Sequence, residues 1–173
     1  MKFSPKRTDS AIRAIYAGLL LVSLLFAGTG QGILKAILTS VALLTLTGSI
    51  YLFIRYDLTT YTYIIKENGE SHDFYIDKSV GKRGGYVCYY PVSDIILIEK
   101  YGKDTKKRLR SKYGKVNFYN YSQNIIKANK SVILFKNDGY HDAVIFEPDD
   151  NFTLAVNSAM DAYACKIQNE NDL

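Results

Sequence analysis

Two long apolar segments open the chain, and short runs typical of strands follow them. The apolar segments are residues 12–28 and 33–54. A helix needs about 20 apolar residues to cross a bilayer, because its backbone groups must be satisfied within the segment. Residues 29–32 alone separate the two segments, which leaves room only for a tight turn. The pattern therefore predicts a two-helix transmembrane hairpin within residues 1–55.

A second interpretation of the first segment is a cleaved signal peptide. Lys2, Lys6 and Arg7 would be its basic region, and residues 27–29 its small-residue cleavage site. The next apolar segment begins almost immediately, so nearly nothing between the two would be exported. The hairpin is therefore the favoured interpretation.

From Tyr56 onward the pattern changes to β-branched and aromatic runs that are separated by turn residues. Asn68-Gly69 is a two-residue hairpin signal, because a type I′ turn needs positive φ at both central positions. Seven strands are predicted at residues 58–66, 73–80, 86–90, 94–101, 115–121, 131–136 and 140–147.

An amphipathic helix is predicted to end the chain. Asp149 or Asp150 can cap it. Its apolar face consists of Phe152, Val156, Met160, Tyr163 and Ile167. Strands and helices do not alternate, so residues 56–173 are predicted to form an α+β domain: an antiparallel β-barrel or sandwich of about seven strands covered by this helix.

Charge distinguishes the two parts. The chain carries a net charge of +5, but residues 56–173 hold 16 basic and 16 acidic side chains, so the excess lies entirely in residues 1–55. The turn between the apolar segments is uncharged, whereas basic residues flank both outer ends, and the positive-inside rule places both termini in the cytoplasm. These residues are Lys2, Lys6, Arg7, Arg13, Arg55 and Lys66.

The order of elements resembles small bacterial membrane proteins that carry a bacterial pleckstrin-homology-like (PH-like) domain. The matching runs are residues 61–65, 73–76, 81–83, 94–96 and 144–149. The resemblance implies a multi-pass protein of the bacterial inner membrane with a cytoplasmic PH-like domain. One departure is the loop at residues 67–71, which is acidic where phosphoinositide-binding PH domains are basic. Phosphoinositide binding is therefore not expected.

A basic stretch is the most unusual local feature, since residues 100–115 hold eight basic side chains against Asp104 alone. Near an anionic leaflet such a segment gains about 1 kcal/mol per Lys or Arg. It is predicted either to contact lipid headgroups or an acidic partner, or to be a solvated loop between two sheets. The candidate membrane- or anion-binding residues are Lys103, Lys106, Lys107, Arg108, Arg110 and Lys112, together with Lys82 and Arg83 in a Gly-rich turn.

Chemistry-bearing residues are sparse. Cys88 and Cys165 have no accompanying histidine cluster, so they are expected to be buried free thiols. His72 and His141 are not paired with a nucleophile in sequence. No catalytic residue, metal or cofactor is expected. Nucleic-acid binding is not expected either, because the domain is neutral and lacks the usual motifs.

The leading hypothesis is a non-enzymatic integral membrane protein. Its domain would bind a protein partner or an anionic lipid surface at the cytoplasmic face, and self-association is left open. Two alternatives remain. One is an accessory or assembly subunit that acts through its transmembrane helices, and the other is a small membrane enzyme acting on lipid headgroups.

Overall fold

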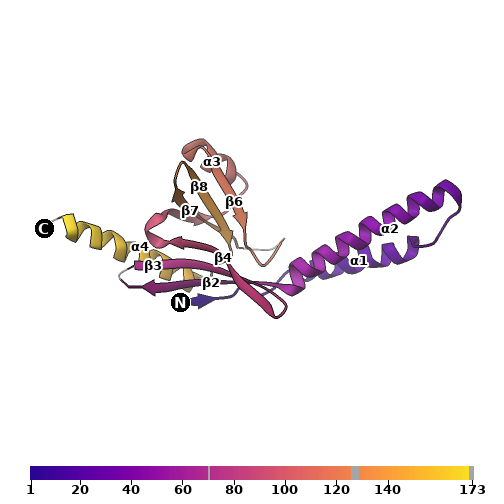
Figure 1. The fold of residues 1–173 in the computed structure, drawn as a ribbon, viewed down its shortest axis with the longest axis horizontal. Coiled ribbons are helices and arrows are strands. Elements are labelled where there is room, and N and C mark those ends of the chain that lie inside the picture. The colour runs from indigo at the N-terminus through magenta and orange to yellow at the C-terminus, as the bar shows by residue number, and fades with distance from the viewer. Residues whose placement is uncertain (70, 126–128, 172–173) are drawn as a thin grey trace.

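The computed structural model describes residues 1–69, 71–125 and 129–171. Within them the fold is α+β, with four α-helices and two four-stranded sheets. A pair of antiparallel helices, α1 (Ser10–Phe26) and α2 (Gly32–Phe53), projects from a domain made of both sheets and the other two helices (Figure 1). The division into a helical hairpin and a β-rich domain follows the hydropathy pattern.

The helical hairpin presents apolar side chains outward. Helix α2 continues into a short π-helical turn, Ile54–Leu58. Within the described residues, one helix, Gly32–Leu58, is long and apolar enough to cross a membrane. Helix α1 is apolar but has only 17 residues. The chain leaves the helix after Phe26, and Gly28 and Gly30 then adopt positive φ. The structure thus supports one of the two predicted spans.

The first sheet contains β1 to β4 in sequential, antiparallel order. Its strands are β1 (Lys2–Phe3), β2 (Thr59–Asn68), β3 (Ser71–Val80) and β4 (Arg83–Pro91). The last three match the prediction. The short strand β1 was not predicted; it brings the N-terminal segment, which precedes the helical hairpin, back onto the edge of the domain.

The second sheet has the order β5-β7-β8-β6. Its strands are β5 (Ile95–Lys100), β6 (Val116–Asn120), β7 (Ser131–Asn137) and β8 (Tyr140–Phe146). The prediction of a wholly antiparallel fold is wrong, because β6 runs parallel to β8. A tight turn after β7 makes β8 antiparallel to it. The connection from β6 to β7 is long enough for the chain to return so that β8 lies next to β6, with β7 on the other side of β8.

The basic stretch is not a loop. It forms α3 (Thr105–Tyr113), which buries Thr105 and Leu109 and exposes its basic side chains. Lys, Arg and Leu are good helix formers. Gly114, with φ of 73°, ends the helix and donates its backbone N–H to the Arg110 carbonyl at 2.9 Å.

The inner faces of both sheets share one aromatic core with α4 (Asp150–Asn171). Asp149 caps this helix as predicted, since its Oδ1 accepts the Phe152 N–H at 2.7 Å. Phe152 and Val156 are buried and Met160 packs partly against the core, whereas Tyr163 is exposed. The side chain of Ile167 lies outside the described residues. In the part of the chain that is described, the sheets do not close into a barrel.

Phe74 joins the two sheets and α4, so its truncation tests this packing. Its ring lies 5.8 Å from the rings of Phe135 and Phe146 and 6.4 Å from that of Phe152. Phe74→Ala is expected to lower the free energy of unfolding by about 3–5 kcal/mol, because it leaves a cavity. Denaturant titration measures this, with Leu154→Ala on the exposed face of α4 as the control. An equal loss in both variants would contradict the shared core.

Candidate functional site

A buried polar junction connects the helical hairpin to the domain. We use this name for the buried side chains of Asp9, Gln123, Asn124 and Glu147, the exposed Arg7 at their border, and the backbone groups that these residues bind. The side-chain amide nitrogen of Gln123, Nε2, donates to the carbonyls of Tyr56 (3.3 Å) and Thr59 (2.9 Å). Its Oε1 accepts the Tyr61 N–H (3.2 Å). One fully buried side chain thereby fixes the segment that leads from α2 into β2.

Asn124 and Glu147 form the centre of the polar junction. The Asn124 backbone N–H and Nδ2 donate to the two carboxylate oxygens of Glu147 at 2.6 and 2.7 Å. Asn124 Nδ2 also donates to the Lys6 carbonyl at 2.8 Å, and its Oδ1 accepts the Thr8 N–H at 2.7 Å. The side chain therefore joins the end of β8 to the N-terminal segment that precedes α1.

Burial dominates the electrostatics of this centre. Glu147 is only 6% exposed. Burial raises the pKa of its carboxyl above the ordinary value, although the two hydrogen bonds from Asn124 act in the opposite direction. Burial also raises the pKa of the neighbouring Tyr63 hydroxyl, which donates to the Tyr121 carbonyl and accepts the Glu147 N–H. The Tyr63 hydroxyl therefore remains protonated at neutral pH.

Ionic and polar contacts also hold together the base of the helical hairpin. Asp57 accepts hydrogen bonds from Arg13 at 2.8 Å and from the Tyr16 hydroxyl at 2.6 Å, which joins α1 to the end of α2. Arg7 Nε donates to the Tyr56 carbonyl at 2.8 Å. Arg55 donates to the Ser122 carbonyl at 2.6 Å. Both ends of the helical hairpin are thus bound to the domain.

The predicted basic residues separate into two groups. The first, which we call the basic surface, lies on or next to α3 and consists of the exposed side chains Lys103, Lys106, Lys107, Arg108, Arg110 and Lys112. Arg108 pairs with Glu99 at 2.6 Å. Lys106 and Arg110 lie over the ring of Phe118, at 5.4 and 5.3 Å from its centroid. The second group is Lys82 and Arg83 at the turn between β3 and β4.

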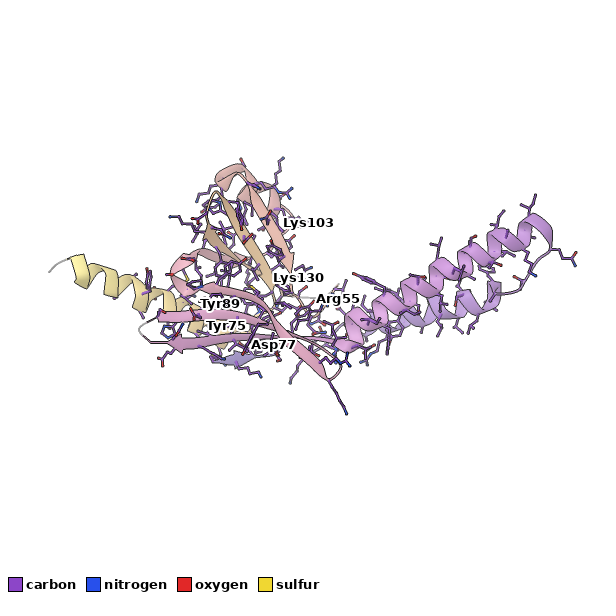
Figure 2. All side chains as sticks on the ribbon, viewed as in Figure 1. Arg55, Tyr75, Asp77, Tyr89, Lys103 and Lys130 are labelled. Atoms are coloured by element: carbon purple, nitrogen blue, oxygen red, sulfur yellow. The ribbon has the colours of Figure 1, made fainter. Side chains whose placement is uncertain are left out.

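The positions of both groups can be compared with the base of the helical hairpin, where the helices join the domain. In Figure 1 the helices slant away from the domain, with α3 on one side of their base and the β3–β4 turn on the other. Figure 2 labels Lys103, Lys130 and Arg55 along the border of the domain from which the helices project. The C-terminal end of α4 projects in the opposite direction (Figure 1). The two groups therefore lie to either side of the base of the helices in this view.

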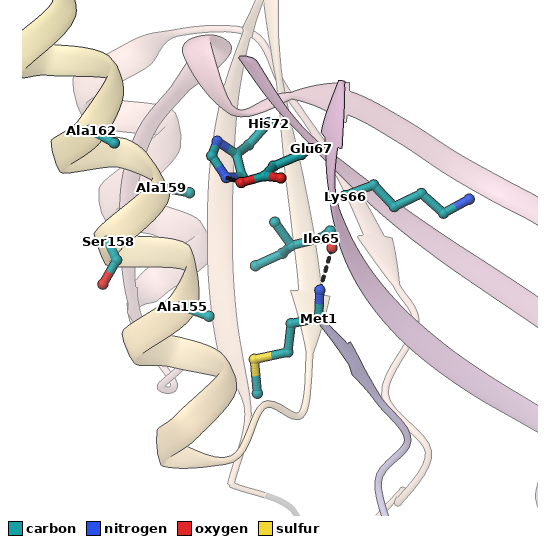
Figure 3. Close-up of a pocket in the computed structure, with 9 residues that line it drawn as sticks. All are labelled: Met1, Ile65, Lys66, Glu67, His72, Ala155, Ser158, Ala159 and Ala162. Atoms are coloured by element: carbon teal, nitrogen blue, oxygen red, sulfur yellow. Dashed lines mark hydrogen bonds and ion pairs between the residues drawn. The ribbon is translucent and has the colours of Figure 1, made fainter. Parts of the chain in front are cut away.

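An open groove of about 630 Å³ lies elsewhere, between α4 and the edge formed by β1 and β2 (Figure 3). Its apolar lining includes Ile65 and the alanines Ala155, Ala159 and Ala162. His72 Nε2 lies 3.8 Å from Glu67 Oε1 in this groove, and the Glu67 side chain is 82% exposed. Water therefore reaches the pair, and the described residues that line the groove form no enclosed polar centre.

The two cysteines differ in environment. Cys88 is buried as predicted, and burial raises its pKa to about 12, so the thiol stays protonated. The prediction is wrong for Cys165, which is exposed, because the second half of α4 extends beyond the core. Within the described residues, no three His, Cys, Asp or Glu side chains are grouped so as to hold a metal ion.

Comparison with known proteins adds no assignment, since neither a family model, nor a curated protein, nor a solved structure matches the chain. Sequence reasoning missed the polar junction. Its one local signal is Ser122-Gln123-Asn124, three consecutive polar residues that the structure buries in the connection after β6.

Glu147 gives the polar junction a pH dependence. Because its folded-state pKa is raised, the native state binds the proton more tightly, and this contribution to stability is lost as pH rises from about 4.5 through the raised value. The free energy of unfolding of Glu147→Gln relative to the wild type is expected to increase across that range. Denaturant titrations at several pH values measure it, with exposed Glu67→Gln as the baseline. If the difference in unfolding free energy between Glu147→Gln and the wild type does not change with pH, the raised pKa of the buried Glu147 carboxyl is contradicted.

Proposed function

We propose that this protein is a non-enzymatic membrane protein whose domain rests on the anionic cytoplasmic leaflet through the basic surface. The observation that supports this most directly is that the basic surface gathers six exposed basic side chains on or next to α3, to one side of the base of the helical hairpin. The domain as a whole is neutral. A tether at Arg55 holds the domain within reach of the leaflet. Attraction to anionic lipid is strongest within a Debye length, about 8–10 Å at ordinary salt.

The proposal includes both helices of the helical hairpin as transmembrane segments. Helix α1 has 17 residues, at the short end of the usual range of about 17–25. Helix α2 runs antiparallel to α1. Arg13, at the cytoplasmic end of α1, pairs with Asp57, so the positive charge of Arg13 is compensated. Basic residues outside both helix ends support a cytoplasmic location for both termini. The bacterial inner membrane and a PH-like relationship remain part of the proposal.

Lipid contact at the basic surface is expected to be weak by itself. Arg108 is partly neutralised by Glu99, and Lys106 and Arg110 are partly engaged with Phe118. About 1 kcal/mol per free basic side chain gives modest affinity. Because the helices keep the domain at the membrane, the contact becomes intramolecular, and weak attraction is then sufficient to orient the domain.

A protein-binding role is the second candidate, and a different surface favours it. Tyr75, Tyr86 and Tyr89 lie together on the outer face of the first sheet, where the ring centroid of Tyr75 is 5.2 Å from that of Tyr86 and 5.0 Å from that of Tyr89. Figure 2 labels Tyr75 and Tyr89. Tyr86 and Tyr89 are more than half exposed. Tyrosine is enriched in protein interfaces. This surface lies on β3 and β4, so a partner bound there would leave the basic surface free.

Hydrogen exchange tests the lipid contact in the full chain. In nanodiscs that contain anionic lipid, the amides of residues 105–113 are expected to exchange more slowly than in wholly zwitterionic nanodiscs, and high salt should remove the difference. Lys103→Glu with Lys107→Glu should abolish it. The matched control is Lys2→Glu with Lys66→Glu on the first sheet, which changes the charge equally and should retain it. Equal exchange in both lipids would contradict the proposal.

A further inference from the structure

We propose that the turn between β3 and β4 is a second, interfacial contact between the domain and the bilayer. We call this segment, residues 80–84, the ribbon tip. The inference rests on the proposed function, because it requires the helices to cross that bilayer. It assigns a lipid-contacting role to residues outside both the helical hairpin and the basic surface.

The ribbon tip is attached directly to the base of α2. The Gly81 N–H donates to the Leu58 carbonyl at 3.0 Å, and Val80 is the register partner of Thr59. Leu58 ends the π-helical turn that continues α2. The ribbon tip is consequently held where the transmembrane helix ends, as Figure 1 shows.

Apolar surface continues from the helix onto the ribbon tip. Phe53, Ile54 and Leu58 are exposed at the end of α2, and Val80, beside them, is 39% exposed. No described helix or strand covers the ribbon tip, since each residue from 81 to 87 is exposed. An exposed apolar strip that adjoins a transmembrane helix fits the boundary between acyl chains and headgroups.

The charges of the ribbon tip fit the headgroup region. Lys82 and Arg83 are exposed at the turn, and no described acidic side chain pairs with either. Long basic side chains can direct their charged ends to lipid phosphates while their stems remain in apolar surroundings. Apolar Val80 next to two cations is thus complementary to an anionic membrane interface.

Contacts on two sides of the helices would define the orientation of the domain. In Figure 1 the ribbon tip and α3 lie on opposite sides of the base of the helical hairpin. A domain that touches the leaflet at both places cannot tilt towards either side without losing one contact. The ribbon tip thereby complements the basic surface.

Single tryptophans give a direct test, because the chain contains none. The full-length variants Val80→Trp, Leu44→Trp and Tyr89→Trp are reconstituted in vesicles that contain anionic phospholipid. Each vesicle preparation includes a phospholipid brominated either near the headgroup or near the end of the acyl chain. Bromine quenches tryptophan on contact, so the two lipids report shallow and deep positions.

Val80→Trp is expected to lose fluorescence mainly to the shallow quencher and to show blue-shifted emission. Leu44→Trp, on the exposed face of α2, should be quenched most by the deep quencher, and Tyr89→Trp by neither. Adding Lys82→Glu and Arg83→Glu to Val80→Trp should reduce the shallow quenching. Arg83→Trp provides a second probe that leaves Val80 unchanged.

The outcomes separate the two proposals. If Leu44→Trp is quenched while Val80→Trp and Arg83→Trp behave like Tyr89→Trp, the ribbon tip lies in water and the inference is overturned, with the membrane anchor intact. If Leu44→Trp is not quenched, the helices do not cross the bilayer, and both the proposed function and the inference fail.

Discussion

The buried carboxylate of Glu147 constrains the arrangement of the whole molecule. A carboxylate in that position needs hydrogen-bond donors, because burying it without partners costs several kcal/mol. Asn124 supplies two of them and also binds the backbone at Lys6 and Thr8. Satisfying this one group therefore brings the connection after β6 to the end of β8, and the same Asn124 side chain then binds the segment before α1.

This constraint has a consequence for function. A helical hairpin joined to a domain by a flexible linker would leave the domain free to rotate above the membrane. Here both ends of the helical hairpin enter the polar junction, and Gln123 fixes the start of β2. Under the proposed function, the same face of the domain is then always presented to the leaflet. A modest excess of basic side chains on that face becomes effective because its orientation is already determined.

The sequence allowed the elements to be predicted more fully than their arrangement. Period-two runs and turn residues located the seven strands of the domain, and Asp149 marked the start of α4. The parallel pairing of β6 and β8 was not predictable, because it depends on where a long connection returns. Helix α3 was not predicted, because its nine residues contain no apolar repeat: Leu109 is its one buried apolar side chain, and Tyr113 packs partly against the same cluster.

The candidate site was predicted in the same uneven way. The basic residues could be recognised by composition, but their separation into two groups on either side of the helices required the fold. The polar junction was invisible because its members lie far apart in the chain: Asp9, Asn124 and Glu147 carry no shared motif. Hydrogen bonds between distant segments depend on the tertiary structure and leave no local pattern.

The central claim is that the polar junction makes the helical hairpin and the domain one rigid body. Pulsed electron spin resonance tests it through the distance between spin labels at Leu44→Cys on α2 and Leu154→Cys on α4, in a Cys165→Ser background, with Cys88 buried. A narrow distance distribution is predicted in bilayers, which broadens when Asn124→Ala and Glu147→Ala remove the centre of the polar junction. A broad distribution with the polar junction intact would contradict the account.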